Sequence, residues 1–90
     1  MPADTDMKIL VVDDFAATRK IVINTLSQLG FNNADEADDG FYALVRLKSA
    51  LFDLVVTDWK MSKMSGMELL KQIRADPNLK HIPVLMVSED

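Results

Sequence analysis

Short apolar runs alternate along the chain with longer segments in which apolar residues recur every three or four positions. Runs of this kind that are rich in β-branched residues are typical of strands buried on both faces. We expect strands at 8–12, 33–37, 52–58 and 83–88. The second is placed by its context, because "NADEA" has a poor β propensity.

Three longer segments, at 15–30, 40–50 and 65–76, predict amphipathic helices. The residues expected to face the core are Ala17, Ile21, Val22, Thr25, Leu26 and Leu29 in the first helix, Ala43, Leu44 and Leu47 in the second, and Met67, Leu70 and Ile73 in the third. Gly30 supplies a stop for the first helix. The third helix stops before Pro77, which disfavours helical backbone at the residue ahead of it.

Strands that alternate with helices indicate an α/β fold, with a parallel sheet covered on both faces. The 90 residues suit a single domain over 1–90, and the sequence contains no internal repeat. The expected N-cap is Asp38 or Asp39 for the second helix and Ser65 for the third.

Composition then narrows the classes of function. The chain is 49% hydrophobic and 27% charged, with a net charge of −4 and no cysteine. The lack of cysteine excludes disulfides and cysteine-based zinc sites, and the negative charge argues against nonspecific nucleic-acid binding. No apolar run approaches the roughly 20 residues that span a bilayer, and the polar start "MPADTD" is unlike a signal peptide. We therefore expect a cytoplasmic protein with neither a nucleic-acid nor a membrane partner.

Carboxylates follow two of the predicted strands. Asp13 and Asp14 come directly after "ILVV", Asp58 ends the third strand, and Ser88 ends the fourth. The carboxyl ends of parallel strands lie at one edge of a sheet. If the first and third strands are neighbours, three carboxylates meet there, and their repulsion costs stability unless a cation joins them. Because oxygen ligands favour hard ions, the sequence predicts a Mg²⁺ site.

An aspartate beside Mg²⁺ can also accept a phosphoryl group covalently. The metal ion offsets the charge on the transferring group and orients it. A hydroxyl at Ser88 is suited to hydrogen-bond a phosphoryl oxygen.

The stretches "ILVVDDF", "VVTDWKM", "GMELLKQIRAD" and "IPVLMVS" resemble the response-regulator receiver domain of two-component signalling, and "GFNNADEADDG" is similar to its chemotaxis type. The resemblance implies a flavodoxin-like (βα) fold with Asp58 as the phosphoacceptor. It further implies that Asp14, Asp58 and the backbone carbonyl of Lys60 ligate Mg²⁺, that Asp13 acts through a water, and that Ser88 is the switch hydroxyl that contacts the phosphoryl group.

The same resemblance implies partners. The phosphodonor would be a phosphohistidine on a sensor histidine kinase, and a flagellar motor or a phosphatase would be a further partner. In this family the domain is a phosphoacceptor that catalyses its own phosphorylation, not an enzyme that acts on a separate substrate.

The sequence departs from the family in two ways. Receiver domains continue with a further helix, a fifth strand that ends in a lysine, and a final helix, whereas this sequence ends at Asp90. We therefore expect the receiver fold without its last strand and helices. After the acceptor, the family usually has Met-Pro-x-Met-Asp-Gly where this chain has "MSKMSG", and Lys60 places a cation that can reach the phosphoryl group or block water.

Without a fifth strand, the run at 83–88 would be an apolar sheet edge that invites pairing with another chain. If about 400 Å² of apolar surface stays exposed to water, the folded chain lacks about 10 kcal/mol of stabilisation from hydrophobic burial. This loss is comparable with the roughly 5–15 kcal/mol stability of a typical domain. We expect a chain that is not a stable, phosphorylation-competent monomer, but a fragment of a longer protein or a module that dimerises or complements a second chain.

Two other functions stay open. One is an interaction or assembly module of the same fold without phosphotransfer. The other is a flavodoxin-like nucleotide or FMN binder, which is disfavoured because no Gly-rich or Ser/Thr-rich phosphate loop follows the first strand.

Overall fold

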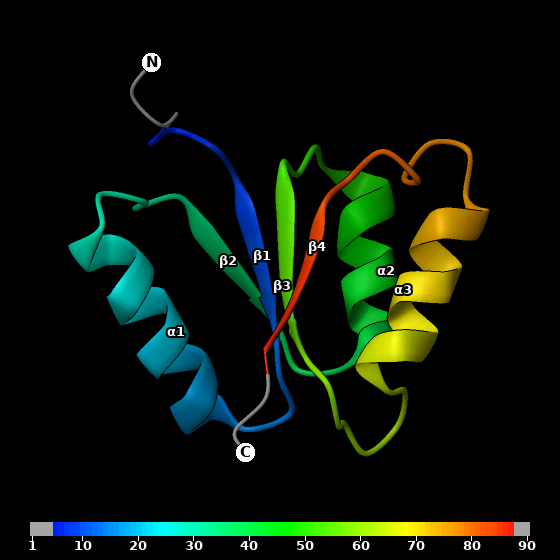
Figure 1. The fold of residues 1–90 in the computed structure, drawn as a ribbon, viewed down its shortest axis with the longest axis horizontal. Helices are drawn as coiled ribbons and strands as arrows, with labels where there is room; N and C mark the ends of the chain where they lie inside the picture. Colours follow the sequence, from blue (N-terminus) through cyan, green and yellow to red (C-terminus); the bar gives the residue numbers. More distant parts are fainter. Residues whose placement is uncertain (1–4, 88–90) are drawn as a thin grey trace.

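The computed structural model describes residues 5–87, which form four strands and three helices that alternate along the chain (Figure 1). The elements are β1 Ile9–Val12, α1 Ala16–Gln28, β2 Ala34–Ala37, α2 Gly40–Ser49, β3 Leu54–Asp58, α3 Gly66–Ala75 and β4 Val84–Val87. The order of elements is the predicted one, and each begins and ends within two residues of its expected bounds. Ser88, which was expected to end the fourth strand, lies outside the described residues.

The strands form one parallel sheet in the order β2-β1-β3-β4. In this order β1 and β3 are direct neighbours, with Val12 opposite Thr57. The expectation on which the predicted site depends, that the first and third strands lie side by side, is therefore confirmed. The chain runs from β1 to β2 on one side of β1, and then crosses from β2 to β3 on the other side. The strand order therefore reverses at β1 and β3, and the carboxyl ends of these two strands are where an α/β sheet commonly holds its functional groups.

Helix α1 covers one face of the sheet, and α2 and α3 cover the other (Figure 1). Strand residues accordingly alternate between two apolar clusters, because successive side chains of a strand point to opposite faces. Leu10, Val12 and Val55 belong to the larger cluster, under α2 and α3. Ile9, Val11 and Val56 form the smaller cluster with α1.

The face that α1 presents to the sheet differs from the predicted stripe. Val22 and Leu26 pack on the sheet as predicted, together with Ile23. The other four residues of the predicted stripe are exposed: Ala17, Ile21, Thr25 and Leu29. Adjacent helical residues are about 100° apart, so a helix docked through both Val22 and Ile23 turns Ile21 toward solvent. Leu29 is exposed because α1 ends at Gln28, and the chain then turns at Gly30 with φ +95°.

Helix α2 buries Ala43 and Leu47 as predicted, with Leu44 partly buried. The stripe predicted for α3 was wrong in part: Ile73 is buried, but Leu69 replaces Leu70 as its fully buried companion, and Met67 is exposed.

Both predicted N-caps are confirmed. The Asp39 carboxylate accepts a hydrogen bond from the Tyr42 N–H at 2.8 Å, and the Ser65 hydroxyl accepts one from the Glu68 N–H at 3.1 Å. These caps fix where α2 and α3 start, at the same edge of the sheet as the carboxyl ends of the strands.

Among the described strands β4 lies at the edge of the sheet and pairs only with β3. Leu85 in this strand is 54% exposed. Val84 packs against the cluster under α2 and α3, so Leu85 points to the opposite face, where α1 does not cover β4. None of the described helices has the length and apolar character needed to cross a bilayer.

Candidate metal centre at the carboxyl ends of β1 and β3

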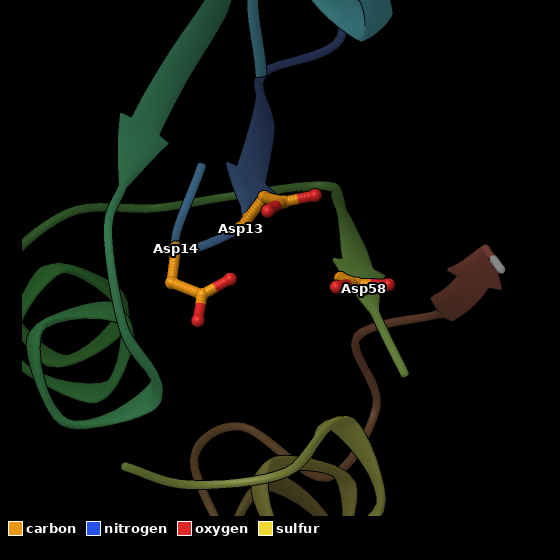
Figure 2. Close-up of side chains that lie close together, drawn as sticks. All are labelled: Asp13, Asp14 and Asp58. Carbon is orange, nitrogen blue, oxygen red and sulfur yellow. The ribbon is translucent and has the colours of Figure 1, made fainter. Parts of the chain in front are cut away.

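Three carboxylates meet just beyond the carboxyl ends of β1 and β3 (Figure 2). Asp13, Asp14 and Asp58 each place a carboxylate oxygen within 4.8 Å of the other two. Asp13 and Asp58 are buried, and Asp14 is half-buried. The convergence follows from the sheet order, since Asp13 and Asp14 continue β1 and Asp58 ends β3.

Backbone hydrogen bonds hold Asp13 and its loop. The Asp13 N–H donates to the Ala37 carbonyl at 3.1 Å, which extends the β1–β2 ladder by one residue. One Asp13 carboxylate oxygen accepts from the Phe15 N–H at 2.9 Å, which closes a tight turn before α1. The turn directs the following chain into the helix while Asp14 stays over the end of the sheet.

Asp58 and Asp14 are held from the loop that follows β3. Asp58 Oδ1 accepts from the Trp59 N–H at 2.8 Å, and the same N–H donates to the Val87 carbonyl at 3.2 Å. Asp14 Oδ2 accepts from the Ser62 N–H at 3.0 Å. The loop after β3 therefore contacts carboxylates from both strands.

The remaining oxygen of Asp14 tests whether the cluster suits a cation. Asp14 Oδ1 is buried and accepts no hydrogen bond within the described part of the chain. A buried carboxylate oxygen without a donor is costly, and it lies beside two further carboxylates. A hard divalent cation satisfies this oxygen and offsets the shared negative charge, so the donor set fits Mg²⁺.

The structure places the lysines of this loop at its surface. Lys60 is exposed two residues after Asp58, and the role of its backbone carbonyl stays a prediction. Lys63 lies 3.5 Å from Asp39 in an ion pair that joins the loop to the start of α2. The hydrogen bond from the Tyr42 N–H holds the pKa of Asp39 below its usual value of 3.8, and the Lys63 charge lowers that pKa further against the opposing effect of partial burial. Trp59 is half-exposed.

Two residues that support the site were missed at the level of sequence. The Arg19 side chain is only 15% exposed and donates to the Asp13 carbonyl. Gly66 lies against the backbone of Asp58. A glycine directly after an N-cap serine is a usable signal, because glycine is a poor helix former; the pairing of Arg19 has no local signal.

Comparison with known proteins decides the family. The sequence pattern described as response regulator receiver domain matches residues 9–90. The chain belongs to the response-regulator receiver family. It is 60% identical over 85 residues to chemotaxis protein CheY-3 of Vibrio cholerae, and the aligned region covers 94% of this chain and 65% of that protein. It is 56% identical over 84 residues to chemotaxis protein CheY of Pseudomonas aeruginosa, covering 93% of this chain and 68% of that protein.

Solved receiver structures share the fold. The chemotaxis response regulator CheY4 of Vibrio cholerae matches with a TM-score of 0.82 and 36% identity, over 90% of this chain and 67% of that one. A response regulator receiver protein from Pseudomonas putida matches with a TM-score of 0.85 and 32% identity, over 100% of this chain and 72% of that one. The predicted receiver fold is thus confirmed for the strands and helices described, and this receiver domain spans about two thirds of the length of its relatives.

Proposed function

We propose that this receiver domain is a Mg²⁺-dependent phosphoacceptor that takes a phosphoryl group onto Asp58 from a phosphohistidine of a sensor histidine kinase. The observation that supports the proposal is the cluster of Asp13, Asp14 and Asp58, with its buried and unsatisfied Asp14 oxygen. The likeness to proteins named as chemotaxis proteins supports a chemotaxis-type switch, located in the cytoplasm, with a flagellar motor or a phosphatase as a further partner. Residues 1–90 are proposed to belong to one receiver domain.

Asp14 and Asp58 would hold Mg²⁺ directly, together with the backbone carbonyl of Lys60, and Asp13 would act through a water. When bound, Mg²⁺ offsets negative charge on the phosphoryl group and orients it. The Ser88 hydroxyl, outside the described residues, is proposed to contact a phosphoryl oxygen.

The chemical step falls to the Asp58 carboxylate. One of its oxygens attacks the phosphorus of the donor, an O–P bond forms, and the P–N bond to the donor histidine breaks. The electron pair of that bond stays on the imidazole nitrogen, which then binds a proton from solvent. The product is an acyl phosphate on Asp58, so the domain is an acceptor that promotes its own modification and does not act on a separate substrate.

Mg²⁺ titration followed by Trp59 fluorescence, and then acetyl phosphate with mass spectrometry, test the proposal. With acetyl phosphate the P–O bond to acetate breaks, acetate leaves, and the protein gains the mass of one phosphoryl group. Asp58→Asn should abolish the gain. Asp53→Asn is the matched control, because Asp53 precedes the amino end of β3, whereas the three carboxylates lie at the carboxyl ends of the strands. The Asp53 carboxylate accepts a hydrogen bond from the Lys8 N–H, and asparagine keeps an oxygen for that bond.

A Mg²⁺-dependent gain of mass that Asp53→Asn keeps and Asp58→Asn loses supports the proposal. A gain that persists in Asp58→Asn would refute the assignment of the acceptor. Mg²⁺ binding without any gain of mass would favour the second candidate.

The second candidate is an assembly module that pairs with a second copy, or complements another chain, through β4. The exposed Leu85 on a strand with one described neighbour supports it, because such an edge offers unpaired backbone groups and apolar surface. Light scattering at increasing protein concentration tests it. Self-association that Leu85→Lys abolishes supports an interface at β4, and a monomer at all concentrations excludes the dimer.

A further inference from the structure

The peptide group between Asp13 and Asp14 is held by a side chain from α1. Arg19 lies in the first turn of α1, and its Nη1 donates to the Asp13 carbonyl at 2.6 Å. Its Nε donates to Glu36 Oε1 at 2.7 Å, so the guanidinium joins the β1–α1 loop to β2. The Arg19 side chain is mostly buried, which restricts it to this geometry.

The Asp13 carbonyl controls where the Asp14 side chain starts. The carbonyl of Asp13 and the N–H and Cα of Asp14 belong to one planar peptide group. A donor that fixes the carbonyl oxygen therefore fixes the plane from which the Asp14 side chain projects. At its other end, the Asp14 carboxylate accepts a hydrogen bond from the Ser62 N–H at 3.0 Å.

We propose that Arg19 is a positioning residue of the carboxylate centre, which sets the Asp14 carboxylate in the geometry that binds a divalent cation. The inference rests on the proposed function, because it assumes that the cluster binds Mg²⁺. Arg19 would act through the backbone of Asp13, to which its guanidinium donates.

The direction in which Arg19→Met changes the Mg²⁺ affinity separates a positioning role from simple electrostatics. A guanidinium beside an acidic centre repels a divalent cation, so charge alone predicts that Arg19→Met strengthens Mg²⁺ binding. Positioning predicts the reverse, since loss of a group that orients a ligand commonly weakens metal affinity about tenfold or more.

The full chain offers a matched control at the other end of the molecule. Arg74, in α3, also clamps backbone carbonyls with its guanidinium, those of Lys80 at 3.0 Å and Ile82 at 2.7 Å. Arg74→Met removes the same kind of interaction near the amino end of β4, away from the carboxylates. Both substitutions should lower the melting temperature, but only Arg19→Met should change the Kd for Mg²⁺.

The experiment measures the Mg²⁺ Kd of wild type, Arg19→Met, Arg19→Lys and Arg74→Met by Trp59 fluorescence, with a thermal melt of each variant. We expect about a tenfold weaker Kd for Arg19→Met, a smaller loss for Arg19→Lys, and the wild-type Kd for Arg74→Met. If Arg19→Met does not fold, Arg19→Lys decides, because lysine keeps the charge but replaces the planar fork with a point donor.

A Kd in Arg19→Met equal to or tighter than that of wild type overturns the inference and leaves the proposed function standing. A wild-type protein that binds no Mg²⁺ overturns the proposed function and the inference with it. An equal weakening in Arg19→Met and Arg74→Met shows a general loss of stability and also overturns the positioning role.

Discussion

Gly66 approaches Asp58 so closely that a β-carbon on Gly66 would lie 2.3 Å from the Asp58 carbonyl oxygen. The Gly66 N–H also donates to the Trp59 carbonyl at 2.8 Å. The start of α3 is therefore packed directly on the backbone that carries the proposed phosphoacceptor. A side chain at this position must move either the helix or Asp58.

Gly66→Ala should lower the free energy of unfolding by about 2 kcal/mol or more, because overpacking a filled site typically costs about 1–3 kcal/mol. It should also weaken Mg²⁺ binding, since the obstructing atom is Asp58 backbone. Chemical denaturation and the Trp59 titration measure the two effects.

Gly40→Ala is the control for that substitution. Its added β-carbon would meet the Met64 side chain, with the sulfur at 2.6 Å and the Met64 β-carbon at 2.9 Å, and a methionine side chain adapts more easily than backbone. We expect a smaller loss of stability. If Gly66→Ala is as stable as Gly40→Ala, the close approach does not constrain Asp58.

Asp14→Asn should stabilise the metal-free protein. Asparagine keeps an oxygen for the Ser62 N–H and removes one of three crowded negative charges. We expect a gain of about 1 kcal/mol in EDTA, which corresponds to a rise of roughly 4–8 °C in melting temperature for a domain of this size.

The same variant should lose its response to Mg²⁺. Wild type should gain about 2.7 kcal/mol at a Mg²⁺ concentration one hundred times the Kd, whereas Asp14→Asn should gain far less. Asp53→Asn, remote from the cluster, should behave like wild type. A lower melting temperature for Asp14→Asn in EDTA would show that the carboxylates do not repel one another in the metal-free state.

The strand pattern and the convergence of the carboxylates were predictable because both depend on local sequence and on one property of parallel sheets. Apolar runs mark the strands, and the carboxyl ends of parallel strands share one edge, so Asp13, Asp14 and Asp58 had to meet once β1 and β3 were neighbours. The weak second strand was found only by its place in the alternation.

The details of helix packing were less predictable. In α3, both Met67–Leu70–Ile73, with spacings of three and three, and Gly66–Leu69–Ile73, with spacings of three and four, are rows along one side of a helix. The sequence pattern alone does not distinguish them. The close contact of Gly66 with the Asp58 backbone selects the second row, which buries Leu69 and leaves Met67 exposed.

The supports of the site depend on pairs that are distant in sequence. The Ser62 N–H reaches Asp14 across 48 residues, and Arg19 reaches Glu36 across 17. Neither pair has a fixed spacing that a pattern reveals, since each depends on where a loop or a helix docks on the finished sheet.

Ser65→Ala should remove the N-cap of α3 and lower the free energy of unfolding by about 1 kcal/mol. Ser65 and Glu68 stand at the spacing of a capping box, three residues apart. Ser62→Ala is the matched control, because the contact of Ser62 with Asp14 uses a backbone N–H that alanine keeps. Equal melting temperatures for the two variants would show that the Ser65 hydroxyl adds nothing to the helix.

Asp39 should make a pH-dependent contribution to stability. Its pKa lies below the usual value of 3.8 in the folded protein, chiefly because the Tyr42 N–H donates to the charged carboxylate, with the Lys63 charge adding to the effect. A carboxyl group whose pKa falls on folding stabilises the protein above its unfolded pKa, and this stabilisation is lost as the pH falls through the folded pKa.

Asp39→Asn keeps an oxygen for the cap but loses the charge. Wild type should therefore be more stable than Asp39→Asn by about 0.5 kcal/mol at neutral pH, and the difference should shrink below pH 3.8. Melting curves of both proteins from neutral to acid pH measure this difference, with Asp38→Asn as the control because Asp39 makes the cap. A difference that stays constant through the acid range would contradict the lowered pKa of Asp39.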